Sequence, residues 1–164
     1  MDLVDFFKQV VADWNAEAKC GFCWEFGAPL QESGANKQQQ QTKCCVNVLV
    51  SDLTVNQQRA FDPVTTFQTS RADSHSFTLL VLKQDEIGKN NYNEVQGHPI
   101  EESKWVETLR PLQECLSAEN LLPFCEKLGY SVQVTAWQMS TKTNYLAANY
   151  TGWQIRGTFK ELIQ

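Results

Sequence analysis

The last stretch of the chain alternates between apolar and polar residues. Its apolar positions are Trp153, Ile155, Gly157 and Phe159, and its polar positions are Gln154, Arg156, Thr158 and Lys160. A period of two is typical of a β-strand with one buried face and one face in water. The pattern therefore predicts a C-terminal strand, entered through a turn at residues 149–152, whose polar face meets solvent or a partner.

Helical periodicity marks the opposite end of the chain. Apolar residues recur every three or four positions over residues 3–16, and Asp2 is suited to cap the first turn. These apolar positions are Leu3, Phe6, Phe7, Val10, Val11 and Trp14. The polar face of this helix is not basic, which disfavours binding to an anionic membrane. We expect an amphipathic helix that packs on a sheet.

Short runs with β character follow this helix. Alternation over residues 22–26 predicts a short strand that ends at Gly27, and the β-branched run at 45–50 predicts a central strand. A polar tract at 31–43 separates them, and we expect it to form a long hairpin loop. Residues 53–62 have no clear period and are expected to form a loop.

The middle of the chain changes from strand to helix. Residues 64–82 predict two strands joined by a turn at 71–74, and a second long polar loop follows at 84–97. From residue 99 to 128 the period is helical. Pro111 should kink this helical segment, because proline removes a backbone donor and clashes with the preceding turn.

The remaining elements complete an α+β pattern. A second helix is expected to begin at Asn120 and to end at Gly129, and a strand at 130–139 leads towards the C-terminal strand. Connections too short or too polar for helical crossovers favour antiparallel pairing. The predicted fold is α+β, with an N-terminal amphipathic helix, a mainly antiparallel sheet, a helical segment (99–128) packed on the sheet, and a C-terminal strand. The 164 residues fit a single domain.

Charge and composition narrow the classes of partner. The net charge is −5 and the pI is near 5.0, so the average field repels nucleic acid, and we expect no sequence-specific binding to it. No segment reaches the roughly 18 to 20 apolar residues that a bilayer helix needs, so we expect no membrane partner. The N-terminus has no signal-peptide pattern, which predicts residence in a cytoplasm with free thiols.

The cysteines form the one motif that suggests chemistry. Cys20 and Cys23 make a C-x-x-C pair, but a strand follows them where a thioredoxin-like redox site has a helix. Zinc needs four ligands, and Cys44 and Cys45 could complete a set with that pair. Adjacent strand residues point to opposite faces, so both would not readily reach one ion. We therefore favour small buried residues over a metal site and expect no cofactor.

Other candidate catalytic residues have no supporting context. His75 and His98 lie beside predicted loops, and we interpret both as surface residues. Glu101 and Glu102 fall in a first helical turn, where the helix dipole favours carboxylates without any catalytic role. No catalytic residue is assigned. A small enzyme or metal/redox protein that uses the four cysteines, and a peptide- or ligand-binding module, remain the alternative functions.

Three short pieces of the sequence combine aromatic residues with glycine or cysteine. They are residues 20–29 (Cys-Gly-Phe-Cys-Trp-Glu-Phe-Gly-Ala-Pro), residues 124–130 (Phe-Cys-Glu-Lys-Leu-Gly-Tyr) leading to Trp137, and residues 149–155 (Asn-Tyr-Thr-Gly-Trp-Gln-Ile). Together they resemble small structural proteins of tailed phages and prophages of gut Bacteroidetes. The predicted layout is also similar to that of the tail-terminator and tail-completion proteins of tailed phages.

This resemblance implies a non-enzymatic virion protein. It would be a ring-forming, homo-oligomeric subunit at the head–tail joint or in the tail, made in the bacterial host cytoplasm and contacting other tail or connector proteins. We expect the two polar loops and the wet face of the C-terminal strand to make these contacts. The candidate interface residues are Gln38, Gln39, Gln40, Gln41, Asn90, Asn91, Tyr92, Arg156 and Lys160.

Overall fold

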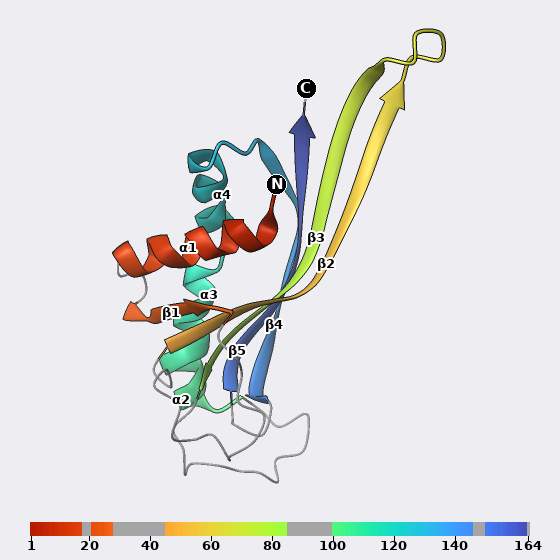
Figure 1. The fold of residues 1–164 in the computed structure, drawn as a ribbon. Helices are drawn as coiled ribbons and strands as arrows, with labels where there is room; N and C mark the ends of the chain where they lie inside the picture. The colour runs from red at the N-terminus through yellow and green to blue at the C-terminus, as the bar shows by residue number, and fades with distance from the viewer. Residues whose placement is uncertain (18–20, 28–44, 85–99, 146–149, 164) are drawn as a thin grey trace.

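A computed structural model describes residues 1–17, 21–27, 45–84, 100–145 and 150–163 (Figure 1). Its elements, in chain order, are α1 (Leu3–Glu17), β1 (Cys23–Phe26), β2 (Cys45–Phe61), β3 (Gln68–Gln84), α2 (Glu102–Lys104), the π-helical turn η3 (Trp105–Leu109), α3 (Arg110–Cys115), α4 (Ala118–Lys127), β4 (Val132–Tyr145) and β5 (Tyr150–Ile163). The α+β class, with an N-terminal helix and a C-terminal strand, is confirmed.

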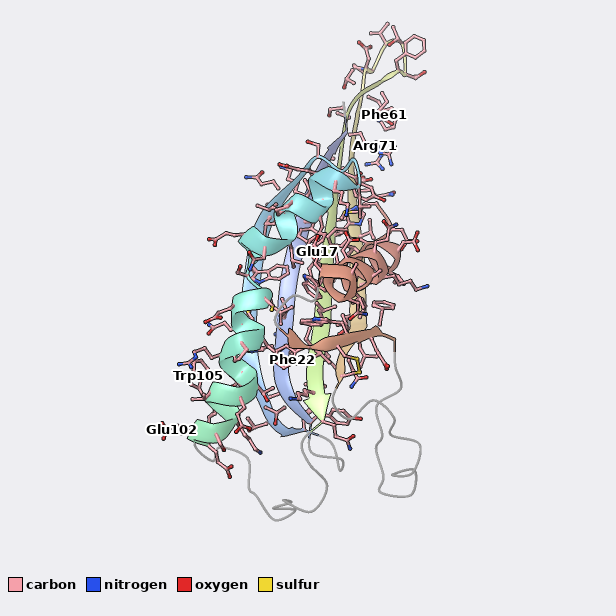
Figure 2. All side chains as sticks on the ribbon, turned by 90° about the vertical axis from the view of Figure 1, so that its left-hand side faces the viewer. Glu17, Phe22, Phe61, Arg71, Glu102 and Trp105 are labelled. Atoms are coloured by element: carbon pink, nitrogen blue, oxygen red, sulfur yellow. A yellow bond between two sulfur atoms is a disulfide. The ribbon has the colours of Figure 1, made fainter. Side chains whose placement is uncertain are left out.

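The strands form one five-stranded sheet in the order β1-β2-β3-β5-β4. Neighbouring strands are antiparallel, except that β1 and β2 are parallel. The helices lie on one face of the sheet, and no described helix covers the other face (Figures 1 and 2). A hairpin pairs its strands antiparallel, so the parallel pairing of β1 and β2 shows that the hairpin expected across residues 31–43 is wrong.

Helix α1 forms where its pattern predicts. The backbone N–H of Asp5 donates to Oδ1 of Asp2 at 3.1 Å, which caps the first turn as expected. All six apolar residues of its stripe are buried. The ring of Phe6 contacts that of Phe159 edge-on at 5.7 Å, and the ring of Phe7 contacts that of Phe77 at 5.2 Å. Burial of one apolar stripe against the sheet therefore fixes this helix.

Strand β5 has the buried and wet faces that its alternation predicts. Trp153, Ile155, Gly157 and Phe159 are all buried. A Cβ on Gly157 would lie 2.6 Å from the ring of Phe77, so only glycine fits between the rings. Tyr150 is already a strand residue, paired with Gln84 of β3, so the turn predicted at 149–152 is wrong for residues 150–152. Pairing with β3 overrides the local turn chemistry there.

The two long strands β2 and β3 differ most from the prediction. Residues 53–61 continue β2, and residues 71–74 lie inside β3, so the loop and the turn expected there are both wrong. The turn lies instead between Phe61 and Gln68. Residues 51–58 are exposed, so this part of β2 needs no apolar alternation. Its strand conformation comes from backbone pairing with β3, which hydrophobic periodicity does not report.

The helical segment changes from a π-helical turn to an α-helix at Arg110, one residue before Pro111. The chain stays helical through Pro111, and η3 sits directly before it, so a wider turn accommodates the missing N–H. Ser117, and not Asn120, is the N-cap residue of α4. Gly129 ends α4 with φ +81°, as predicted. The apolar face of this segment packs on the sheet, where Nε1 of Trp153 donates to the carbonyl oxygen of Leu109 at 2.9 Å.

We predict that Gly152→Ala destabilises the fold. A Cβ at this position would overlap the backbone carbonyl oxygen of Val81, which cannot move without breaking the β3–β5 pairing. Overpacking against backbone should lower the free energy of unfolding by at least about 2 kcal/mol, measured by urea denaturation. Ser140→Ala, at an exposed position of β4, is the control and should change stability by less than about 0.5 kcal/mol. A fully stable Gly152→Ala variant would contradict the close approach of β3 and β5.

Candidate functional site

The β2–β3 hairpin projects beyond the rest of the molecule (Figure 1). The last rung that β3 shares with β5 joins Arg71 to Ile163. Residues 60–70 therefore form a two-stranded ribbon that no third described strand supports, and we call this segment the arm. Two-stranded hairpins are marginally stable on their own in water. Contact with a partner would therefore add stability to an arm of this kind.

The tip of the arm is held in one conformation by Asp62. Its carboxylate accepts the backbone N–H groups of Val64 at 2.8 Å and of Thr65 at 3.0 Å. These hydrogen bonds, that of Thr65 foremost, lower the pKa of Asp62 below its ordinary value. Its backbone also pairs with Thr66 and Phe67 across the turn. The tip is therefore preorganised, which reduces the entropy cost of docking.

Three large apolar side chains are exposed on this tip. Phe61 is 59% exposed, Val64 88% and Phe67 75% (Figure 2). Aromatic residues on a projecting, ordered element are typical anchors of protein interfaces. Hydrophobic periodicity does not indicate this site. The Asp62-Pro63 dipeptide between two phenylalanines is a turn signal that could have located it.

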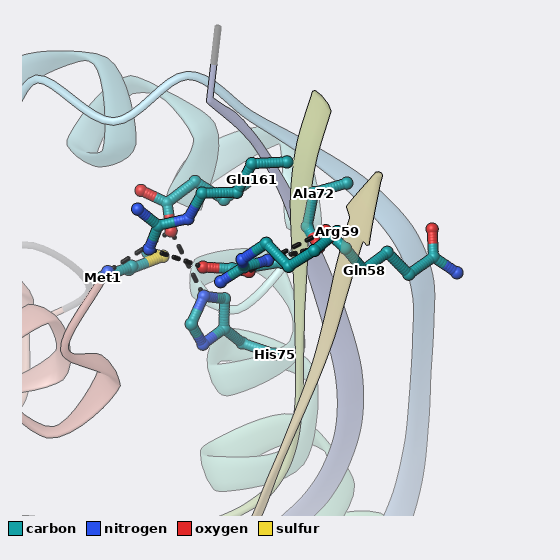
Figure 3. Close-up of polar contacts among 8 residues, drawn as sticks. Met1, Gln58, Arg59, Ala72, His75 and Glu161 are labelled. Carbon is teal, nitrogen blue, oxygen red and sulfur yellow. Dashed lines mark hydrogen bonds and ion pairs between the residues drawn. The ribbon is translucent and has the colours of Figure 1, made fainter. Parts of the chain in front are cut away.

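A cluster of charged residues lies at the base of the arm (Figure 3). Arg59 donates to Oδ1 of Asp73 at 2.6 Å, and Arg71 donates to Oδ2 of the same carboxylate at 3.2 Å. The hydrogen bond from Arg59 is the main reason why the pKa of Asp73 lies below its ordinary value. Nε2 of His75 lies 3.2 Å from Oε2 of Glu161, which joins β3 to β5. The cluster thus ties the root of the arm to the body of the sheet.

His75 is not the surface residue that we expected, because it is 4% exposed within β3. Asp73, His75 and Glu161 place one ligand atom each within 4.8 Å of one another, so the set could in principle hold a divalent cation. Two guanidinium groups already contact Asp73, and the amino group of Met1 lies 3.3 Å from Glu161. A metal ion would have to displace these cations, so we assign the cluster a structural role.

Three of the four described cysteines are not the free thiols that we expected. Cys23 and Cys45 are register partners in the β1–β2 pair and form a disulfide. Cys115 is also disulfide-bonded. Cys125 is a buried free thiol whose pKa burial raises to about 11. Two of the weak zinc candidates are therefore bonded to each other. The other two, Cys20 and Cys44, lie outside the described residues.

The polar face of β5 carries the described members of the candidate interface. Arg156 is exposed and Lys160 is half-buried, both on the face away from the helices. A shallow groove of about 260 Å³ crosses that face, lined by hydroxyl groups such as those of Thr54 and Ser76 and by Arg156. Ligand pockets are usually larger, so the groove does not favour a small-ligand site. The remaining interface candidates, Gln38–Gln41 and Asn90–Tyr92, lie outside the described residues, as does His98.

Comparison with known proteins does not assign the chain to a family. No family model matches it, and no curated protein matches it. Among the described helices, none is long and apolar enough to cross a lipid bilayer. The functional assignment therefore depends on the arm, the sheet and the sequence resemblance.

We predict a pH signature for the charged cluster. Because the folded-state pKa of Asp73 is lowered, its contribution to stability is present above its unfolded pKa of about 3.9 and is lost as the pH falls through the folded value. Asp73→Asn should lower the free energy of unfolding at pH 7, and its difference from wild type should shrink below about pH 3.9. Urea titrations between pH 7 and 2.5 measure this. Asp13→Asn, which removes an exposed pair with Lys127, is the control and should have little effect. A difference that does not change with pH would contradict the assignment.

We also predict the reactivity of the described thiols. With a pKa of about 11, only about one in a thousand Cys125 side chains is ionised at pH 8, and the group is buried. Iodoacetamide should label Cys125 only after the protein unfolds. It should label Cys23 and Cys45 only after their disulfide is reduced. Mass spectrometry of the peptides reads out both results. Labelling of Cys23 in the native, unreduced protein would show that the disulfide does not form.

Proposed function

We propose that this protein is a non-enzymatic structural protein of a tailed-phage virion. It acts as a homo-oligomer, a ring-forming subunit of tail-terminator or connector type at the head–tail joint or in the tail. The observation that carries the proposal is the arm, an ordered ribbon that presents Phe61, Val64 and Phe67 to solvent. An isolated subunit gains nothing from exposing these side chains, whereas an assembled one buries them.

The geometry of the arm supports assembly over catalysis. Its tip is fixed by Asp62 and its root by the Arg59–Asp73 ion pair, so it reaches a neighbour as a preformed element. Preformed apolar anchors bind with a low entropy cost. In contrast, the alternative metal or redox function was based on four cysteines, of which Cys23 and Cys45 are bonded to each other.

The phage assignment is based on the sequence resemblance. In the fold, residues of its three pieces pack in the core: Trp24 contacts Trp14 at 4.2 Å, Phe124 contacts Trp14 at 6.4 Å, and Trp153 is buried. The resemblance therefore concerns the fold and not a reaction. Disulfides persist in oxidising surroundings, which a virion released from the bacterial host cytoplasm meets outside the cell.

The test combines oligomeric state with virion content. Sedimentation velocity should show oligomers of the purified protein, alone or with tail components, and mass spectrometry should detect the chain in purified virions of the phage or prophage that encodes it. A strict monomer that is absent from virions would overturn the proposal.

A variant of the arm sharpens this test. Phe61→Ser combined with Phe67→Ser should abolish incorporation into virions while changing the free energy of unfolding by less than about 1 kcal/mol, because both side chains are exposed. Val106→Ser, which removes an exposed apolar side chain from η3, is the matched control and should be incorporated normally. Normal incorporation of the double variant would show that the arm is not the element that contacts other virion proteins.

A further inference from the structure

Within the described residues, the sheet has an unpaired strand edge at both of its ends. β1 pairs with β2 only at Cys45–Val48, where the N–H of Gly27 donates to the carbonyl oxygen of Val48 at 2.9 Å. Beyond that point, no strand of the described chain covers the outer edge of β2 at residues 49–61. At the other end of the sheet, the outer edge of β4 is unpaired within the described residues. Long open edges are templates for pairing with another chain.

The described residues of the two edge strands include few that would protect an edge. Residues 49–61 contain two charged residues, Asp52 and Arg59, and β4 contains one, Lys142; neither strand contains proline. Natural proteins usually block such edges with several lysines, with proline or with a covering segment. The two edges are also similar in length, at about 44 Å and about 48 Å, for a rise of about 3.4 Å per residue.

Apolar side chains of both edge strands remain unburied on the face that carries the helices. On β2 these are Leu53, 43% exposed, and Val55, 45% exposed. On β4, Val134, Trp137 and Met139 pack on the core but are only half-buried. If the two edges met, these side chains would lie next to one another and would form one continuous apolar layer.

The strand directions permit this pairing between copies. Four strands, β2, β3, β5 and β4, alternate in direction, so β2 and β4 run in opposite directions within one chain. Across one sheet, Thr54 is level with Ala136, through Ser76 and Thr158. A contact that shifts one copy along the strands of the next needs a rotation axis inclined to the strands, as in a β-barrel, and such a rotation keeps neighbouring strands antiparallel. β4 of one copy then meets β2 of the next in antiparallel orientation, and repetition of this heterologous contact closes a ring when the rotation divides a full turn.

We infer that β4 of one copy pairs antiparallel with residues 49–61 of β2 in a second copy. This inference rests on the proposed function, because it names the partner surface that builds the homo-oligomer. Full overlap of the two strands sets the register, with Thr54 opposite Ser140. The same register places the Asp52 carboxylate opposite the Lys142 ammonium on the open face of the sheet. It also places Val55 opposite Met139 on the face that carries the helices.

Cysteine cross-linking tests the register directly. Thr54 and Ser140 are both exposed and lie on the open face, and within one chain β3 and β5 separate their strands. Their Cα atoms are therefore too far apart for a disulfide inside one subunit. Oxidation of the Thr54→Cys, Ser140→Cys double variant should convert most of the monomer band on non-reducing gels into a ladder, which a reductant removes.

The controls use the same strands. Wild type and each single variant should give no ladder, and neither should Thr54→Cys with Gln133→Cys, because Gln133 lies seven residues away along β4. Dimers from Thr54→Cys alone would overturn the inference in favour of a two-fold β2–β2 contact. Absence of the Thr54–Ser140 ladder in protein that sedimentation shows to be oligomeric would also overturn it and leave the proposed function intact. Wild-type protein that is monomeric and absent from virions would overturn both the β4–β2 pairing and the proposed function.

Discussion

The contact on which the rest of the structure depends joins α1 to the middle of the sheet. Phe6 and Phe7 project from the helix onto Phe159 and Phe77, and these two rings touch each other at 5.2 Å across the β3–β5 pair. Gly157 leaves the space in which the rings of Phe77 and Trp137 meet. Because α1 lies over β3 and β5, residues 51–61 of β2 extend past the core, whereas Val46 and Val48 at the start of that strand lie inside it. The exposed apolar side chains of β2 are a consequence of that placement.

The parts of the fold that the sequence predicts are those that bury one face. The stripe of α1 and the alternation of β5 both report contact with the core, and both elements form as expected. Residues 53–61 belong to a strand whose side chains are mostly exposed, so no apolar period marks it. Its conformation is set by backbone pairing with β3, a distant segment that local sequence does not reveal.

The candidate site illustrates the same limit. His75 follows the turn predicted at residues 71–74, which suggested a surface position, yet its partner Glu161 comes from the far end of the chain. The Cys23–Cys45 disulfide depends on the parallel pairing of β1 with β2, which spacing along the sequence cannot show. In contrast, Arg156 and Lys160 lie on the face that alternation assigns to them. Long-range partners, and not local propensity, decide the remaining cases.

The arm gives the subunit two unlike ends. It leaves the sheet along the strand direction, past the end of β5, so it marks one end of the molecule and not a flank (Figure 1). Copies related by rotation about an axis inclined to their strands would therefore all have their arms on the same rim of the ring. The two rims of such a ring differ, because one rim carries the phenylalanine side chains of the arm tips and the other carries none. A ring with two different rims can dock on a growing structure through only one of them. A single hairpin would therefore determine in which direction assembly proceeds.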